Sequence, residues 1–172
     1  EIFTESSQNS EIWKIFEFKG VIYFQGFNVL FSLSGGQIEE IKLPGQITYC
    51  FVVQDQMLAA TIDRGIFRLS GNEFVQINRW NILKGNIIHH IEENSGKTFL
   101  FTHKSGVYID EDGILKKWDH PVNNLLMNEL IITAKFIDKK KIAIGTASNG
   151  LYIINTTDSK YFNINRTSGL QN

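Results

Sequence analysis

The chain has 172 residues, which is enough for one domain with a sizeable core. Hydrophobic residues make up 42% of the chain and aromatic residues 12%, with only two prolines. This composition favours strands over long helices. The 17 basic and 18 acidic residues are spread without blocks and give a formal charge of −1. The sequence therefore contains no basic stripe that could bind a phosphate backbone or anionic lipid, and we expect no nucleic-acid partner.

A short phrase recurs along the chain. In chain order it reads Gln25-Gly26-Phe27-Asn28-Val29-Leu30-Phe31, Thr61-Ile62-Asp63-Arg64-Gly65-Ile66-Phe67, Thr102-His103-Lys104-Ser105-Gly106-Val107-Tyr108 and Thr146-Ala147-Ser148-Asn149-Gly150-Leu151-Tyr152. The first copy is degenerate, with Gln in place of Thr and Val in place of Gly. We predict that each Thr ends the second strand of a repeat and that each Gly opens the third strand. The period of about 40 residues indicates a repeat protein.

Each phrase lies among short segments that are rich in β-branched and aromatic residues and are separated by turn residues. In the last repeat we predict strands at Leu130 to Ile137, Ile142 to Thr146, Leu151 to Ile154 and Tyr161 to Ile164. Second strands are nearly continuously apolar, as in strands covered on both faces, and fourth strands are more polar. Turn residues recur every 8 to 12 positions in this sequence, which leaves no room for the helices of a solenoid.

Four antiparallel strands per repeat predict an all-β fold, a β-propeller of about four blades. The chain is interpreted as a single propeller segment of residues 1–172, with repeats at approximately 11–46, 47–86, 87–129 and 130–172. We expect an open arc of a larger propeller, because both ends read as parts of neighbouring blades. Such an arc would leave apolar faces at its ends, including Trp13, Ile15, Phe16 and Phe18, and would self-associate.

The fourth repeat resembles a known family. The phrase Ile142-Ala143-Ile144-Gly145-Thr146-Ala147-Ser148-Asn149-Gly150-Leu151-Tyr152, the later Phe162, and Ser168-Gly169-Leu170-Gln171-Asn172 are similar to the two-component regulator propeller repeat. That repeat combines an apolar-Gly-Thr strand end, a Gly-Leu third strand and a Gly-Leu-x-Asn lead-in. The resemblance is strong in the fourth repeat, moderate in the second and third, and weak in the first. Ala143, Phe99 and Leu58 stand where the family usually has an aromatic residue.

The resemblance implies a propeller of about seven blades that forms the sensor part of hybrid histidine kinases and related bacterial transcription regulators. It also implies a periplasmic location and a small-molecule or oligosaccharide ligand. The function expected on this basis is ligand sensing in signal transduction, and any kinase would lie elsewhere in the full-length protein. A protein-interaction scaffold and a propeller lyase or glycosidase are the alternatives.

Ligand-binding candidates come from two sets of loops, those between strands two and three and those between blades. The selected residues are Arg64, Trp80, His103, Lys104, His120 and Asn149. An aromatic ring beside Arg, Asn and His suits a sugar, which stacks its apolar face and pairs its hydroxyls. Ordinary loop polarity, with Trp80 and Trp118 packed between blades, is the alternative.

Other chemistry has weaker support. His89 and His90 are adjacent on a strand and point to opposite faces, so they cannot bind one metal ion. The segment 110–112 is interpreted as a solvated hairpin tip rather than a calcium site, and Cys50 as a small buried core residue. Residues 92–99 form a degenerate Asp box on a first hairpin. With no catalytic spacing, we expect neither an enzyme nor a cofactor in this segment.

Overall fold

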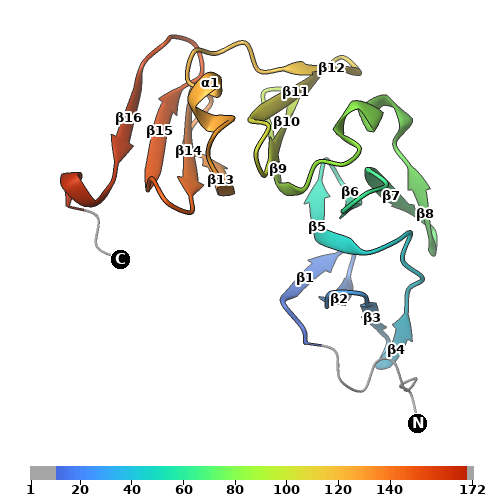
Figure 1. The fold of residues 1–172 in the computed structure, drawn as a ribbon. Coiled ribbons are helices and arrows are strands. Elements are labelled where there is room, and N and C mark those ends of the chain that lie inside the picture. Colours follow the sequence, from blue (N-terminus) through green and yellow to red (C-terminus); the bar gives the residue numbers. More distant parts are fainter. Residues whose placement is uncertain (1–10, 170–172) are drawn as a thin grey trace. The chain divides into compact units, whose positions relative to one another are not determined.

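The computed structural model describes residues 11–169. Within these residues sixteen strands form four antiparallel sheets of four strands each, and in every sheet the strands are neighbours in chain order (Figure 1). Meandering four-stranded sheets are the blades of a β-propeller, so the predicted all-β fold is confirmed. The chain divides into two compact units, residues 1–85 and 86–172, each of which contains two blades.

The first unit holds blades 1 and 2. Their strands are β1 (Lys14–Phe18), β2 (Val21–Gln25), β3 (Leu30–Ser34), β4 (Gln37–Glu40), β5 (Ile47–Val53), β6 (Gln56–Thr61), β7 (Ile66–Ser70) and β8 (Glu73–Gln76). A short 3-10 helix, η1 (Asn78–Leu83), follows β8.

The second unit holds blades 3 and 4. Their strands are β9 (Ile88–Asn94), β10 (Lys97–Thr102), β11 (Val107–Glu111), β12 (Ile114–Lys117), β13 (Ile131–Phe136), β14 (Lys141–Thr146), β15 (Leu151–Asn155) and β16 (Tyr161–Ile164). One helical turn, α1 (Asn123–Leu126), joins the two blades, and η2 (Arg166–Ser168) follows β16. The strands of the last repeat lie within a residue or so of their predicted bounds.

The core of the first unit forms where blade 1 packs on blade 2. Tyr23 and Leu30 of blade 1 cluster with Met57, Ala59 and the fully buried Cys50 of blade 2. The expectation that Cys50 is a core residue is confirmed. Gln25 is also fully buried between these blades, where its Oε1 accepts the backbone N–H of Cys50 at 2.9 Å. Its Nε2 donates to the carbonyl of Thr48 at 3.2 Å, so both ends of the buried amide are satisfied.

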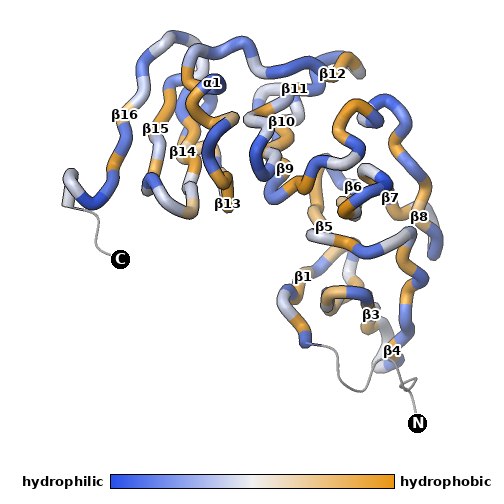
Figure 2. The backbone as a smooth tube through the Cα atoms, in the orientation of Figure 1, coloured by the Kyte–Doolittle hydropathy of each residue, from blue (hydrophilic) through white to orange (hydrophobic). Residues whose placement is uncertain are grey.

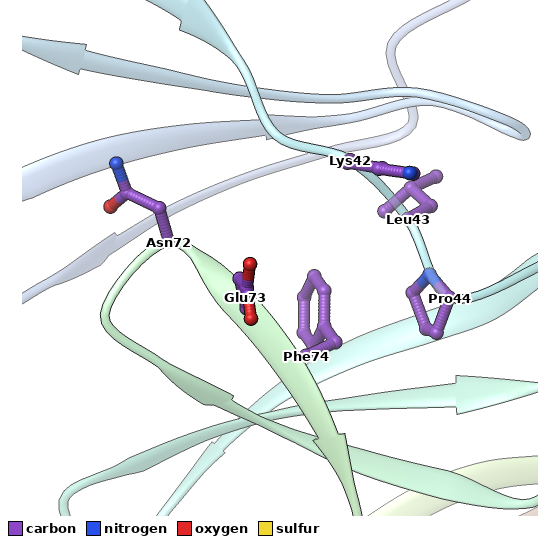
Figure 3. A pocket seen from close by; sticks show the side chains of 6 residues that line it. All are labelled: Lys42, Leu43, Pro44, Asn72, Glu73 and Phe74. Carbon is purple, nitrogen blue, oxygen red and sulfur yellow. The ribbon is translucent and has the colours of Figure 1, made fainter.

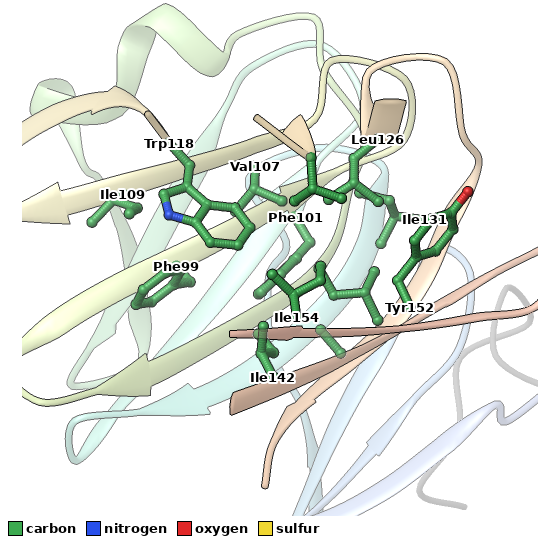
Figure 4. Close-up of a cluster of buried hydrophobic side chains, with 13 residues drawn as sticks. Phe99, Phe101, Val107, Ile109, Trp118, Leu126, Ile131, Ile142, Tyr152 and Ile154 are labelled. Carbon is green, nitrogen blue, oxygen red and sulfur yellow. The ribbon is translucent and has the colours of Figure 1, made fainter. Parts of the chain in front are cut away.

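The core of the second unit lies between blades 3 and 4 (Figure 4). Phe101 and Ile144 are both fully buried there, as expected from their strand positions. Phe99 makes edge contacts with Phe136 across the two blades, at a centroid distance of 4.9 Å. Burial of these side chains is the main source of stability that the repeat supplies.

The second strands of the blades are buried and the outer, fourth strands are exposed, as predicted. In β6 and β10 every residue after the first is buried, whereas Glu39, Glu40, Lys116 and Lys117 of the outer strands are exposed. Along the tube of Figure 2, hydrophobic colour gathers on strands such as β13 and β14, and hydrophilic colour marks the connection from β12 to α1. The polar outer strands keep the exposed blade edge in water.

The residues expected to be exposed on blade 1 divide into two groups. Trp13 and Ile15 are exposed, at 48% and 64%, as expected. The expectation was wrong for Phe16 and Phe18, which are partly buried against the core of the first unit. The reason is the strand period of two, which turns Phe16 and Phe18 toward blade 2 and Ile15 away from it.

A β-bulge recurs in the first strand of blades 2, 3 and 4. Thr48, His89 and Ile132 are the extra residues, each next to a buried isoleucine that pairs with the threonine at the end of the second strand. A bulge re-aims the side chain that it carries. The repeat geometry therefore places three side chains differently from a regular strand.

Candidate functional site

The turns between second and third strands are built by one arrangement in blades 2, 3 and 4. Thr61, Thr102 and Thr146 end β6, β10 and β14, which confirms their predicted equivalence. The Thr102 hydroxyl donates to the Gly106 carbonyl at 2.7 Å and accepts the Ser105 N–H at 2.9 Å. The same two bonds form around Thr61 and Thr146. The threonine thus fixes the loop in which the candidates Arg64, His103, Lys104 and Asn149 lie.

In blades 3 and 4 glycine closes this turn for a steric reason. Gly150 has a φ of +75°, and a Cβ atom there would lie 2.2 Å from the Ile164 carbonyl oxygen. At Gly106, with a φ of +76°, a Cβ would lie 2.5 Å from Oδ1 of Asn123. Both the backbone conformation and the packing of the next segment therefore require glycine.

In the first unit the two candidates have different surroundings. Arg64 is exposed, and its guanidinium donates to the Pro44 carbonyl at 3.0 Å. Trp80 of η1 is only 3% exposed, with the guanidinium of Arg79 at 5.3 Å from its ring. Trp80 is therefore held as a packing residue, and Arg64 is the candidate that a ligand can reach.

The first unit also carries a shallow pocket that sequence reasoning missed (Figure 3). Lys42, Leu43 and Pro44 of the β4–β5 connection line one side, and Asn72 of the β7–β8 turn with Glu73 and Phe74 of β8 line the other. Phe74 and Leu43 provide apolar surface between charged and amide groups. The pocket needs a turn and a connection about 30 residues apart, and no local motif signals that juxtaposition.

His103 in the second unit contacts His89, the bulged residue of β9. Nε2 of His89 and Nδ1 of His103 lie 2.8 Å apart. Burial lowers the pKa of His89 below its ordinary value, and the neighbouring His103 lowers it further. Burial also lowers the pKa of His103, with Lys104 as the second cause. Both imidazoles are therefore neutral at pH 7, so that one donates to the other.

His90 faces a different environment from His89. Its Nε2 lies 3.1 Å from Oε2 of Glu92, and its ring lies near Phe101. The two adjacent histidines thus make separate contacts, as expected for neighbours on a strand. Within residues 11–169 no group of three or more His, Cys, Asp or Glu side chains is placed to hold a metal ion.

His120 is a packing residue in the connection between blades 3 and 4. It is 7% exposed and stacks on Trp118 at a centroid distance of 4.6 Å. Its Nε2 faces the carbonyls of Asn155 and Asp158 at 3.1 and 2.7 Å, and its Nδ1 accepts the Val122 N–H. The partners are therefore two carbonyls at Nε2 and a backbone N–H at Nδ1, which together fix the orientation of the ring.

A shallow groove lies along the outer side of this connection. Its lining residues are Lys117, Trp118, Asp119, His120, Pro121, Asn123, Asn124 and Met127. Lys117, Asp119 and Asn124 are exposed, whereas Trp118 and His120 form a buried aromatic wall. The groove therefore offers both charges and an amide beside an apolar surface.

Asn149 contacts a residue, Glu129, that was not among the predicted site residues. Its Nδ2 donates to Oε1 of Glu129 at 2.6 Å, and Tyr152 donates to the same oxygen at 3.3 Å. Glu129 is only 9% exposed, so this carboxylate is a structural acceptor. Burial raises the pKa of Tyr152, and Glu129 raises it further.

Asn123 is a second buried polar residue that was not selected as a site residue. Its Oδ1 accepts the Val107 N–H at 2.8 Å, and its Nδ2 donates to the carbonyls of Val107 and Trp118. These bonds attach α1 to the start of β11 and hold the lining of the groove in place. His103, His120 and Asn149 each contact different partners, so their side-chain contacts within residues 11–169 do not gather them into one cluster.

Comparison with solved structures assigns the chain to a class of fold, the β-propeller. The WD40 β-propeller domain of Doa1 matches with a TM-score of 0.58 and 8% identity, over 84% of this chain and 50% of that one. No family model matches the chain. No curated protein matches it either.

Two extracellular domains from B. thetaiotaomicron are more similar. The domain of BT3049, assigned as a hybrid two component system, has a TM-score of 0.71 and 16% identity, over 91% of this chain and 25% of that one. The domain of BT4673, assigned as a one component system, has a TM-score of 0.72 and 18% identity, over 92% and 22%. The chain thus spans about a quarter of the length of these domains. At identities this low, the structural similarity shows a shared fold and nothing more.

None of the helices in residues 11–169 is long and apolar enough to cross a membrane.

Proposed function

We propose that the chain is a segment of the extracellular ligand-sensing propeller of a bacterial two-component-type regulator, on the periplasmic side of the membrane. The similarity to two extracellular domains of such systems, over nine tenths of this chain, is the observation that carries the proposal. A sensor needs a rigid frame that presents loops to a ligand, and the repeated Thr-Gly turns supply such loops.

The ligand is a small carbohydrate, and its site is the groove of the second unit that Lys117 to Met127 line. The stacked rings of Trp118 and His120 are 7% exposed and lie behind the groove, so a carbohydrate C–H face contacts only the small part of each ring that reaches the surface. Asp119 accepts hydroxyl protons, Lys117 donates to ring and hydroxyl oxygens, and Asn124 does both.

A neutral sugar suits this groove better than a charged one. One ammonium, on Lys117, and one carboxylate, on Asp119, face the same groove, so neither sign of ligand charge is favoured. His120 contributes no proton transfer because both of its ring nitrogens are engaged. The proposed activity is therefore binding without turnover, as a sensor requires.

The proposal is tested by screening the chain on an array of neutral and acidic oligosaccharides and then titrating the best neutral binder by calorimetry. Asp119→Asn and Asn124→Ala should each weaken binding by about tenfold, since each removes one or two hydrogen bonds. Asn72→Ala and Glu73→Gln change the other pocket and should leave the affinity unchanged.

Two results would contradict the proposal. Binding to no oligosaccharide on the array would overturn the carbohydrate class and favour a protein-interaction scaffold. Loss of binding in the Asn72 and Glu73 variants alone would place the site in the first unit instead.

A further inference from the structure

One backbone hydrogen bond recurs where the bulged first strand of a blade lies beside the turn that follows the second strand. In blade 3 the N–H of His103, the residue after Thr102, donates to the Ile87 carbonyl at 2.8 Å. This acceptor lies two residues before the bulged residue. The same bond joins the corresponding residues of blades 2 and 4, Ile62 to Gln46 and Ala147 to Leu130. The repeat thus holds the bulge close to the residue that follows the threonine.

Blade 3 has histidine at both of these positions, and the other two bulged blades have it at neither. His89 is the bulged residue of blade 3, and His103 follows the threonine. The corresponding pairs are Thr48 with Ile62 in blade 2 and Ile132 with Ala147 in blade 4. The repeated turn therefore forms without histidine, so the fold does not require the pair in blade 3.

The two imidazole rings meet through one nitrogen each. Nε2 of His89 and Nδ1 of His103 lie 2.8 Å apart, the ring centroids lie 5.1 Å apart, and the ring planes differ by 25°. Zinc–nitrogen bonds of about 2.0–2.1 Å at a tetrahedral angle place two such nitrogens about 3.3 Å apart. The pair therefore needs to open by only about half an ångström to hold one ion between these two atoms.

The backbone that carries the pair is held in place on both sides. The Thr102 hydroxyl fixes the turn, and the Ser105 hydroxyl donates to Oδ1 of Asn86 at 2.6 Å, which ties the turn to the residues before β9. The two rings therefore lie together before an ion binds, and little freedom is lost on binding. His103 is half-buried beside the exposed Lys104, so an ion can approach its ring from solvent.

We propose that Nε2 of His89 and Nδ1 of His103 together bind one divalent late transition-metal ion such as zinc. Imidazole nitrogens suit zinc, copper and nickel, whereas magnesium and calcium take oxygen ligands. Both rings are already neutral at pH 7, as coordination requires. The hydrogen bond between them is lost when the ion enters, and one imidazole moves its N–H proton to its other ring nitrogen.

The ion is exchangeable rather than structural. Within residues 11–169 no third His, Cys, Asp or Glu side chain is placed to join the pair, so water fills the remaining positions. Structural zinc sites use four protein ligands instead. The site is separate from the carbohydrate groove of the proposed function, and its metal binding does not depend on that function.

Calorimetric titration of the whole chain with zinc chloride tests the proposal. Wild type should bind one ion, and His103→Gln should weaken binding by about tenfold or more, since a lost ligand costs at least as much as a lost outer-shell partner. His90→Gln is the matched control and should leave the affinity unchanged, because His90 contacts Glu92 instead. Lys104→Gln should tighten binding by about twofold or more, because it removes a positive charge beside the ion. Magnesium chloride should give no binding heat.

A second measurement shows the ligands directly in wild type and so protects the test against a variant that fails to fold. In nuclear magnetic resonance spectra of the histidine ring nitrogens, one equivalent of zinc should shift the signals of His89 and His103 together. The signals of His90 and His120 should shift less. A wild-type chain that binds no zinc, a His103→Gln variant with wild-type affinity, or larger shifts at His90 or His120 than at the pair would each overturn the proposal.

Discussion

Replacing Gly150 by Ala tests the repeated turn most sharply, because the same chain offers a matched control. Gly150 and Gly96 have nearly the same φ, +75° and +78°, so an alanine at either site meets the same backbone penalty, about 1–2 kcal/mol. Nothing lies within 4 Å of a Cβ at Gly96, whereas at Gly150 the Ile164 carbonyl oxygen is 2.2 Å away. The difference between the two variants therefore measures the packing of the turn alone.

The loss of stability in the Gly150→Ala variant can be estimated from the part of the structure that must move. The obstacle at Gly150 is backbone, which no side-chain rotamer can relieve, so the turn must shift away from β16. A shift breaks the bonds that Thr146 makes with the Gly150 carbonyl and the Asn149 N–H, each worth about 0.5–1.5 kcal/mol. Three such bonds added to the backbone penalty mean that Gly150→Ala should lower the free energy of unfolding by about 2.5–6.5 kcal/mol, and Gly96→Ala by only about 1–2 kcal/mol.

Urea unfolding followed by circular dichroism and tryptophan fluorescence measures both variants against wild type. A loss for Gly150→Ala that equals the loss for Gly96→Ala would refute the steric account of the Thr-Gly turn. It would leave the repeated glycine explained by its backbone conformation alone.

Four further expectations concern other parts of the fold. Phe101→Ala or Ile144→Ala should lower the free energy of unfolding, measured with urea, by about 2–5 kcal/mol, because both side chains are fully buried between blades. An unchanged free energy of unfolding would contradict the blade packing. Gln25→Ala should cost about 1–3 kcal/mol, since it leaves the buried Cys50 N–H without its acceptor, and equal stability would show that water replaces the amide. Burial raises the pKa of the Cys50 thiol to about 12, so a thiol reagent at pH 8 should label it only after urea is added; fast labelling of native protein would disprove this. Folding lowers the pKa of His103, so as the pH falls the unfolded chain binds a proton before the folded chain does. The free energy of unfolding should therefore decline as the pH falls below about 6.5. The same decline in a His103→Gln variant would show that His103 is not its cause.

The regular parts of the fold could be predicted from the sequence because their signals are local. Thr146, Gly150 and the apolar residues after them specify a strand end, a turn and the start of a new strand within seven residues, and the predicted strands of the last repeat are close to those observed. The first repeat shows the limit of such reasoning. Its turn is one residue shorter, so Gly26 and not Gln25 donates to the carbonyl that precedes β3, and Gln25 turns into the core instead.

Features that depend on distant residues could not be predicted in the same way. The bulge at His89 is defined by its pairing with β10, and no sequence signal marks it. Glu129 and Asn123 are polar residues in a connection and resemble solvated loop residues until their partners in other strands are known. The candidate residues Trp80 and His120 proved to be buried, because aromatic rings in connections cover the adjacent core. Arg64, Lys104 and Asn149 remain exposed and stay candidates.

The most direct test of the sensor account is a transcriptional reporter in cells that express the complete gene encoding this chain. The oligosaccharide selected on the array should induce the reporter in wild type, fail to do so with Asp119→Asn plus Asn124→Ala, and induce it normally with Asn72→Ala plus Glu73→Gln. Full induction by the Asp119 and Asn124 double variant, at wild-type protein levels, would contradict the assignment of this groove as the sensing site.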